Sequence, residues 1–249
     1  MRVLILTAGY ARRLRPLTDH LPKCLLQVAG VPILRRSLDH LVSLGMSELV
    51  VVTGHEAGKV RDAIGAWYPR LPVTFIDNPD YLTTNNAYSL LMSRPALDGR
   101  EFFLLDGDIL YDAGALERLL DHGPDCLALR TGELGLEEVK VDIDGSGRIL
   151  GIGKEVPVPG AAGESVGIQY FSAATSTALY RALHERVTVD GRVDEYYEAS
   201  FQQMIDGGVQ LRALDIAPFY AIEIDTREDL AAANDTLLAR ASRTDSAAL

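Results

Sequence analysis

Three small residues and two cationic residues follow the first apolar run of the chain: Ala8, Gly9, Ala11, Arg13 and Lys23. Small side chains let backbone N–H groups approach a phosphate, and an arginine and a lysine supply full positive charge to it. Ligands of open α/β sheets bind beyond the carboxyl ends of the strands, so this order of residues predicts a phosphate-binding loop. The segment lacks both the Gly-Lys-Ser/Thr ending of a Walker A motif and the Gly-x-Gly-x-x-Gly fingerprint. A surface loop with solvated arginines is the alternative that the residue types leave open.

Two later segments each deliver carboxylates at the end of an apolar run. Residues 102–105 precede Asp106 and Asp108, and residues 220–224 precede Asp225. Because strands of an α/β sheet present ligand-binding groups at one edge, we expect these acids to lie near the cationic loop. The plainer alternatives are an ordinary Asp-Gly turn and an aspartate beside a helix start.

A run of asparagines lies between these segments. An amide presents both hydrogen-bond donors and acceptors, so Asn85 and Asn86 have the groups needed to recognise the edge of a nucleobase, and Ser89 adds a hydroxyl. The alternative is that one asparagine caps a helix, and both roles are compatible.

The first segment resembles the signature of the sugar-phosphate nucleotidylyltransferase superfamily, Leu-Ala-Ala-Gly-x-Gly-Thr-Arg-Leu-x-Pro-x-Thr followed by Pro-Lys. The residues in register with it are Arg13, Leu14, Pro16, Thr18, Pro22 and Lys23. Thr7 replaces an alanine of the signature, Ala11 replaces its second glycine, and Arg12 replaces a small hydroxyl residue. Ala11 is a mild change from glycine if the backbone keeps a negative φ there.

This resemblance implies an α/β fold of the nucleotide-diphospho-sugar transferase type, with three Rossmann-like α/β/α layers, a mixed, mostly parallel central sheet and a small antiparallel extension. It implies that Arg13 and Lys23 are catalytic, and that Asp108 and Asp225 hold Mg²⁺, a hard cation that prefers carboxylate and phosphate oxygens. The implied nucleotide-binding residues are Leu6, Ala8, Gly9, Tyr10, Ala11, Arg12, Asn85, Asn86, Ser89 and Asp106.

The segment Asn-Asn-x-Tyr-Ser-Leu at residues 85–90 resembles the branch that uses CTP on phosphorylated alcohols, which includes phosphocholine, inositol-1-phosphate and phosphonate cytidylyltransferases. We therefore expect Mg²⁺-dependent transfer of CMP from CTP to a phosphorylated small alcohol or phosphonate, with release of pyrophosphate. One alternative is a hexose-1-phosphate or cyclitol-phosphate nucleotidylyltransferase that uses UTP, dTTP, GTP or ATP. A more distant alternative is a non-catalytic, nucleotide-binding regulatory protein.

Four residues are candidates for binding the acceptor. Lys154 matches the second family lysine, which is expected to hold the acceptor phosphate, and Glu164 is a further candidate. Tyr196 and Tyr197 stand among acids, as a cage for a quaternary ammonium group requires. The alternatives are a solvated lysine at a strand end and tyrosines that pack in the core.

Strand-like and helix-like runs alternate around these motifs. Apolar runs at residues 3–7, 49–53 and 102–105 predict buried strands, and residues 33–44 and 113–120 predict amphipathic helices. Glycine-punctuated alternation at 139–143, 148–150 and 166–171 predicts the antiparallel extension. Thr226 and Asp229 predict the start of a last helix that ends near Ala239.

We expect one domain over residues 1–240, with a nucleotide-binding part at about 1–125, an acceptor-binding part at about 126–240 and a frayed tail at 241–249. The 249 residues carry a net charge of −11, which repels nucleic acids and anionic membrane surfaces. No run approaches the roughly 18 apolar residues that span a bilayer. Two distant cysteines suggest neither a disulfide framework nor a zinc site, so a cytoplasmic protein is expected. The sequence leaves open whether copies associate into a homo-oligomer.

Overall fold

The computed structural model describes residues 1–247 of the backbone and the side chains of residues 1–242. Four parallel strands form one side of a nine-stranded sheet, with β5 at its edge: β1 (Arg2–Thr7), β4 (Glu48–Thr53), β5 (Val73–Asp77) and β6 (Phe102–Asp106). Strand β1 lies between β4 and β6, and both pairings are parallel. Their carboxyl ends therefore meet at one edge of the sheet, as the sequence predicts.

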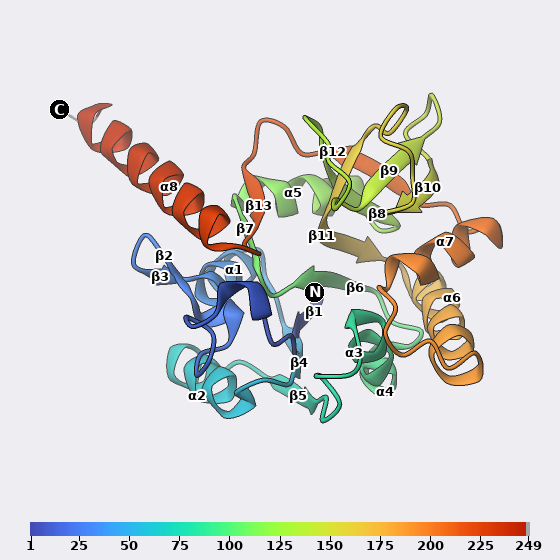
Figure 1. The fold of residues 1–249 in the computed structure, drawn as a ribbon, viewed down its shortest axis with the longest axis horizontal. Coiled ribbons are helices and arrows are strands. Elements are labelled where there is room, and N and C mark those ends of the chain that lie inside the picture. The colour runs from blue at the N-terminus through green and yellow to red at the C-terminus, as the bar shows by residue number, and fades with distance from the viewer. Residues whose placement is uncertain (248–249) are drawn as a thin grey trace.

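The other five strands extend this sheet: β8 (Cys126–Arg130), β9 (Lys140–Ile143), β10 (Ile149–Gly153), β11 (Gly163–Phe171) and β12 (Arg212–Asp215). Strand β11 pairs antiparallel with β6, and it also pairs with β8 and β9. It begins three residues before the expected start at Val166 and belongs to the central sheet itself. The extension is thus continuous with the parallel strands (Figure 1).

Helices cover both faces of the sheet. The first face packs against α1 (Ile33–Ser43), α2 (Ala57–Trp67) and α5 (Ala113–His122). The second face packs against α3 (Asn86–Met92), α4 (Arg94–Leu97), α6 (Ala173–Leu183) and α7 (Glu198–Asp206). The predicted three-layer α/β fold is therefore confirmed.

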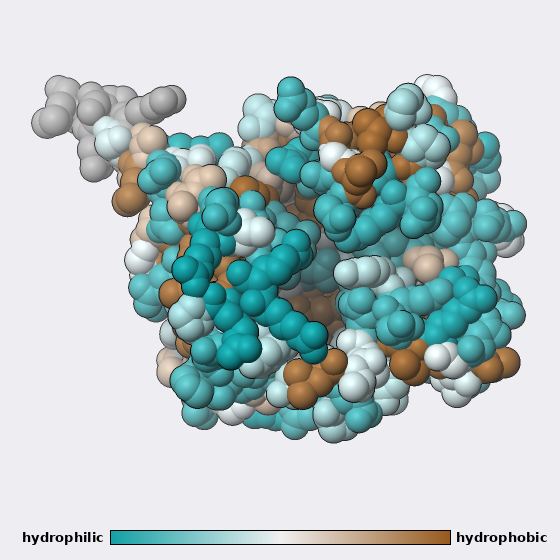
Figure 2. Space-filling model, viewed as in Figure 1, coloured by the Kyte–Doolittle hydropathy of each residue, from teal (hydrophilic) through white to brown (hydrophobic). Residues whose placement is uncertain are grey.

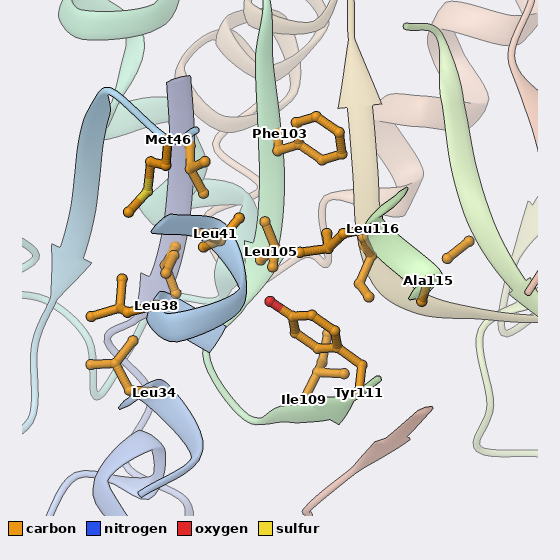
Figure 3. Close-up of a cluster of buried hydrophobic side chains, with 14 of the residues drawn as sticks. Leu34, Leu38, Leu41, Met46, Phe103, Leu105, Ile109, Tyr111, Ala115 and Leu116 are labelled. Atoms are coloured by element: carbon orange, nitrogen blue, oxygen red, sulfur yellow. The ribbon is translucent and has the colours of Figure 1, made fainter. Parts of the chain in front are cut away.

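Period-two alternation in the buried strands produces these two cores. In β1, Val3 and Ile5 lie in the first core, whereas Leu4 and Leu6 lie in the second. Helix α1 turns Leu34, Leu38 and Leu41 toward the first face, as Figure 3 shows. Burying one such leucine contributes roughly 1.5–3 kcal/mol, so these contacts stabilise the sheet whose strand ends form the site.

Two short antiparallel sheets complete the structure: β2 (Gln27–Val28) with β3 (Val31–Pro32), and β7 (Ile109–Tyr111) with β13 (Ala221–Glu223). The second of them is important for the site, because β7 follows Asp108 and β13 precedes Asp225. The Ile224 N–H donates to the Asp108 carbonyl oxygen at 3.1 Å, which closes this pairing. Two acids 117 positions apart are thereby brought to one place.

The last helix, α8 (Arg227–Ala247), begins as predicted and ends later than predicted. The Asp229 carboxylate accepts from the Thr226 N–H at 2.7 Å, and the Thr226 hydroxyl accepts from the Asp229 N–H at 3.1 Å, which is a capping box. The expected end near Ala239 is wrong, because the helix continues to Ala247. The expected fraying of the tail after residue 240 stays a prediction. Residues 248–249 lie outside the described part. Among the described helices, none is long and apolar enough to cross a bilayer.

Candidate active site

A cavity of about 390 Å³ lies at the carboxyl ends of β1 and β6. Figure 2 shows this face of the molecule hollowed near its centre, between the N-terminal part and the antiparallel extension of Figure 1. Most of the predicted site residues line it: Leu6, Ala8, Gly9, Ala11, Arg13, Lys23, Asn85, Asn86, Ser89, Asp106, Asp108, Lys154, Glu164, Tyr196 and Asp225. Residues from distant parts of the sequence therefore converge on one concave site.

Three predicted residues lie elsewhere. Tyr10 packs edge-on against His55, with ring centroids 4.7 Å apart, and Arg12 is exposed in a 3-10 turn at Arg12–Leu14. Tyr197 is fully buried at the start of α7, so its ring does not reach an acceptor in this arrangement. Neither Tyr10, Arg12 nor Tyr197 lines the cavity.

The backbone at Ala11 does not meet the condition under which alanine is a mild change from glycine. Its φ of 49° and ψ of 54° are left-handed rather than negative in φ. The Ala11 carbonyl accepts from the Leu14 N–H at 3.1 Å and from the Thr18 hydroxyl at 3.0 Å, and these contacts hold the turn. An L residue with a Cβ is strained in this region, which explains why glycine suits this position of the signature.

Glycine is required where the ends of β1 and β6 come together. A Cβ on Gly107 would lie 2.6 Å from the Leu6 carbonyl oxygen, and the Gly107 N–H donates to that same oxygen at 2.8 Å. The Asp-Gly pair is therefore more than a turn, because the missing side chain lets Asp108 sit against the end of β1.

Arg13 and Lys23 pair with the predicted metal ligands. The Lys23 ammonium lies 2.6 Å from Asp108 Oδ2 and 2.5 Å from Asp225 Oδ1, and Arg13 contacts the other oxygen of Asp225. Burial alone would lower the pKa of Lys23, but Asp108, Asp225 and Glu223 raise it above its usual value. Burial alone would raise the pKa of Asp225, but Lys23 and Arg13 lower it. Lys23 and Asp225 thus both carry their charges at neutral pH.

A third acid, Glu223, belongs to this cluster. Ligand atoms of Asp108, Glu223 and Asp225 all lie within 4.8 Å of one another. Burial, with Asp108 and Asp225 nearby, raises the pKa of Glu223 to about 8. The Asp108 Oδ1 atom is buried and accepts no hydrogen bond from any described residue. Clustered carboxylates with a free buried oxygen suit a divalent cation, which supplies the missing positive charge.

Asp106 faces the cavity from a buried hydrogen-bond network. The Tyr197 hydroxyl donates to Asp106 Oδ2 at 2.6 Å. Burial, and then the charge of Asp108, raise the pKa of Asp106 well above its usual range. Gly167, in β11, has a φ of +69°, and a Cβ there would meet Asp106 Oδ2 at 2.6 Å. Tyr197 is therefore a residue that positions Asp106.

The asparagine pair connects the two halves of the molecule. Asn85 caps α3, its Oδ1 accepting from the Asn86 N–H at 2.8 Å, and its Nδ2 donates to the Asp194 carbonyl. The Asn86 Oδ1 accepts from the Tyr197 N–H at 2.8 Å. The predicted cap and a link to the segment before α7 are both present, while the two residues still line the cavity.

The cavity also contains residues that the sequence prediction missed, notably Asn78, Glu138, Glu198 and Glu223. Glu223 stands two positions before Asp225, and period-two alternation along a strand predicts that they share a side. Asn78 directly follows β5, so it lies at the carboxyl ends of the parallel strands, where ligands were expected. Glu198 ends the string of acids and tyrosines at residues 194–198, but its place in the cavity depends on how α7 packs.

Fold and site together define a class, the α/β enzymes that bind a nucleotide beyond the strand ends of a mostly parallel sheet. Residues 3–190 match the model of the MobA-like NTP transferase domain, and the chain belongs to this family. The protein is accordingly a nucleotidyltransferase.

Several curated relatives are named as nucleotidyltransferases. A 2-aminoethylphosphonate cytidylyltransferase from Lancefieldella rimae is 27% identical over 235 residues, which cover 92% of this chain and 90% of that protein. A CMP-5'-(3-aminopropyl)phosphonate synthase from Streptomyces rubellomurinus is 40% identical over 119 residues, covering 48% of this chain but only 19% of that longer protein. A UTP–glucose-1-phosphate uridylyltransferase from Haloferax volcanii is 34% identical over 113 residues, which cover 45% of each protein.

Among solved structures, CTP:phosphocholine cytidylyltransferase from Streptococcus pneumoniae superposes with a TM-score of 0.79 at 21% identity. The match covers 95% of this chain and 98% of that one. At this identity the similarity shows a shared fold.

Proposed function

We propose that the protein transfers CMP from CTP to a small acceptor that carries a phosphate or phosphonate, and releases pyrophosphate in a reaction that depends on Mg²⁺. The observation that carries this proposal is the convergence of Arg13 and Lys23 with Asp108, Glu223 and Asp225 in one cavity. Cations and clustered acids at strand ends suit a polyanionic nucleotide and its counter-ion.

The reaction needs positioning more than proton transfer. An acceptor oxygen attacks the α-phosphorus in line and forms the new P–O bond, while the bond from the α-phosphorus to the bridging oxygen breaks and pyrophosphate leaves with its electron pair. A phosphate monoester has a second pKa of about 6, so the attacking oxygen is already ionised near neutral pH and no general base is needed. Arg13 and Lys23 hold the triphosphate and stabilise the charge of the transition state. Small residues at 8, 9 and 11 let backbone N–H groups contribute.

Asp108, Glu223 and Asp225 are the residues that would hold Mg²⁺. The free buried Oδ1 of Asp108 supports this assignment. When bound, the ion supplies positive charge to the phosphate oxygens. Lys23 balances two of these acids, and its long side chain would let the ammonium turn toward a phosphate.

Cytidine is the proposed base for two reasons. Asn85, Asn86 and Ser89 line the cavity with amide and hydroxyl groups, and two of the relatives are named for cytidylyl transfer or a CMP product. The second candidate is uridylyl transfer to a hexose-1-phosphate, which the Haloferax volcanii relative favours. The negative net charge argues against nucleic acid as a substrate, and small phosphorylated substrates favour a cytoplasmic location.

The test is pyrophosphate release across a matrix of CTP, UTP, dTTP, GTP and ATP against phosphocholine, 2-aminoethylphosphonate, inositol-1-phosphate and glucose-1-phosphate. We expect release with CTP to exceed that with every other nucleotide by at least about tenfold, the discrimination that 1.4 kcal/mol gives. Asp108→Asn should abolish most of it, and the exposed Asp121→Asn serves as a control of equal charge change. A preference for UTP with glucose-1-phosphate would establish the second candidate instead, and no release with any pair would favour a regulatory nucleotide-binding protein.

A further inference from the structure

A second cavity, of about 1080 Å³, adjoins the first. Four residues line both cavities: Val139, Lys154, Tyr196 and Glu198. The two cavities therefore meet where the acceptor is expected, and an acceptor bound through its phosphate in the first cavity can extend toward the second.

Glu198 is a buried acid at this junction. It is the first residue of α7, it is 7% exposed, and its Oε2 has no hydrogen-bond partner among the described residues. Burial raises the pKa of Glu198 to about 7, although its own backbone and the charge of Lys154 act to lower it. A buried carboxylate oxygen without a hydrogen-bond donor raises the free energy of the folded chain, so we expect a ligand to supply this donor.

Two further acids lining the first cavity have the same property. Glu138 Oε2 and Glu164 Oε2 are buried without a partner in the part of the chain that the structure describes. Arg130 occupies only the other oxygen of Glu164, at 2.9 Å. This side of the cavity, where the second substrate is expected, therefore has three carboxylate oxygens that no described residue contacts with a hydrogen bond. It offers more hydrogen-bond acceptors than the described residues supply donors.

A protein cation already stands near this place. The Lys154 ammonium lies 5.0 Å from the centre of the Tyr196 ring and 3.3 Å from Glu137, which is itself largely exposed. The ring is thus oriented so that an ammonium group can lie over it. If Lys154 turns to the acceptor phosphate, as the family resemblance implies, this place is left to another cation.

We propose that the acceptor carries a protonated primary amine at the end away from its phosphate or phosphonate, and that Glu198 accepts a hydrogen bond from this amine beside the Tyr196 ring. This inference rests on the proposed transfer to a phosphate or phosphonate acceptor. It narrows the acceptor to a zwitterionic ω-aminoalkyl phosphate or phosphonate.

The contacts favour a primary amine over a quaternary one. An unpaired carboxylate oxygen needs an N–H donor, and a primary ammonium has three, whereas a trimethylammonium group has none. A quaternary cage also needs several aromatic faces. Tyr196 is 49% exposed at the junction, but the Tyr197 ring is buried against Phe201, with centroids 4.9 Å apart, and does not reach the cavity.

The first test compares acceptors that differ at one group, using the unmodified protein, CTP and Mg²⁺. We expect kcat/KM for 2-aminoethylphosphonate to exceed that for ethylphosphonate by about 10- to 100-fold, the effect of a lost hydrogen bond to a charged group. The value of kcat/KM for phosphoethanolamine should likewise exceed that for phosphocholine. Equal values within both pairs would overturn the inference while leaving cytidylyl transfer intact. A preference for phosphocholine would instead establish a quaternary cage.

The second test asks whether Glu198 is the residue that recognises the amine. In Glu198→Gln, which keeps the shape of the side chain and removes its charge, the ratio of kcat/KM between 2-aminoethylphosphonate and ethylphosphonate should fall toward one. Glu133→Gln removes the same charge from an exposed position outside both cavities and should keep the ratio of the unmodified protein. A ratio that is the same in Glu198→Gln as in the control would overturn the role of Glu198. Absence of CMP transfer to every acceptor in the unmodified protein would overturn the proposed function itself, which is a different result.

Discussion

The two ends of the site differ in how their charges are balanced. At the strand-end side, Lys23 pairs with Asp108 and Asp225, and Arg13 pairs with Asp225. At the acceptor side, Glu198 and two other acids keep buried oxygens that no described residue contacts with a hydrogen bond. On the proposed function, the first end exchanges its internal ion pairs for a nucleotide and its cation, whereas the second end receives the ammonium group of the acceptor. This difference leads us to infer that anionic phosphates bind at the strand-end side and that the positive charge of the acceptor binds at the other side.

The largest effect on activity is expected when an ion pair at the strand-end side is removed. Lys23→Ala removes a cation that holds the triphosphate and leaves Asp108 without its paired cation, so kcat should fall by about 10²- to 10³-fold. Steady-state release of pyrophosphate from CTP measures this loss. Lys59→Ala, at a half-exposed lysine outside the cavity, is the control. A fall of less than threefold in Lys23→Ala would mean that this lysine only balances the acids.

A comparable loss is expected at Glu223, the acid that the sequence prediction missed. Glu223→Gln removes one of three clustered carboxylates, so the Mg²⁺ concentration for half-maximal activity should rise at least about tenfold. Titration of activity with Mg²⁺ at saturating CTP measures the shift, and chelation should abolish activity in the unmodified protein. An unchanged Mg²⁺ requirement would exclude Glu223 from the ligands.

The unbalanced end should make stability depend on pH. The pKa of Glu198 is about 7 in the folded chain, above the usual value of 4.5, so the folded state binds the proton more tightly than the unfolded state does. Its unfavourable contribution is absent below about pH 4.5, grows as the pH rises, and is complete above about pH 7. Glu198→Gln should therefore be more stable than the unmodified protein at pH 8, by about 1–3 kcal/mol, and should lose this advantage near pH 5. Urea unfolding at both pH values measures the difference; an advantage of equal size at both would contradict the assignment.

A smaller effect is expected from the residue that links the two ends. Tyr197→Phe removes the hydroxyl that donates to Asp106, leaving a buried carboxyl oxygen without this donor. We expect a loss of about 1–2 kcal/mol in the free energy of unfolding, measured with urea. Tyr196→Phe, which keeps the ring at the junction, should change stability by less than about 0.5 kcal/mol.

The smallest effect concerns the turn at the start of the loop. Ala11→Gly relieves left-handed strain but gives the unfolded chain more freedom, so the net gain in stability should be below about 1 kcal/mol. Thermal unfolding measures it. A loss of more than 1 kcal/mol would show that the Ala11 side chain contributes packing that outweighs its strain.

Much of the fold follows from local patterns. Strands β1, β4 and β6 and helices α1 and α5 lie close to the ranges expected from apolar period and length. The place of β11 inside the central sheet does not follow from local pattern, because strand order is decided by pairing between distant segments. The same holds for the backbone of Ala11, whose φ is set by contacts with Leu14 and Thr18.

The site divides in a similar way. Arg13, Lys23, Asp108 and Asp225 carry recognisable spacing, and they meet as expected. Glu198 belongs to the string of acids and tyrosines at residues 194–198, but this string does not reveal its burial, which depends on the packing of α7 against β10 and α6. Tyr197, next to it, was expected at the acceptor but lies beneath Asp106. The sequence therefore does not reveal which side chains at the start of α7 reach the cavity and which are buried beneath it.

Phosphorus NMR of the protein mixed with CTP and 2-aminoethylphosphonate, followed with Mg²⁺ and then with excess chelator, tests the central claim most directly. The account predicts that signals of pyrophosphate and of a mixed phosphonate–CMP anhydride grow together with Mg²⁺ and stop growing after chelation. Formation of CDP and inorganic phosphate in their place, or consumption of CTP at the same rate without the phosphonate, would contradict it.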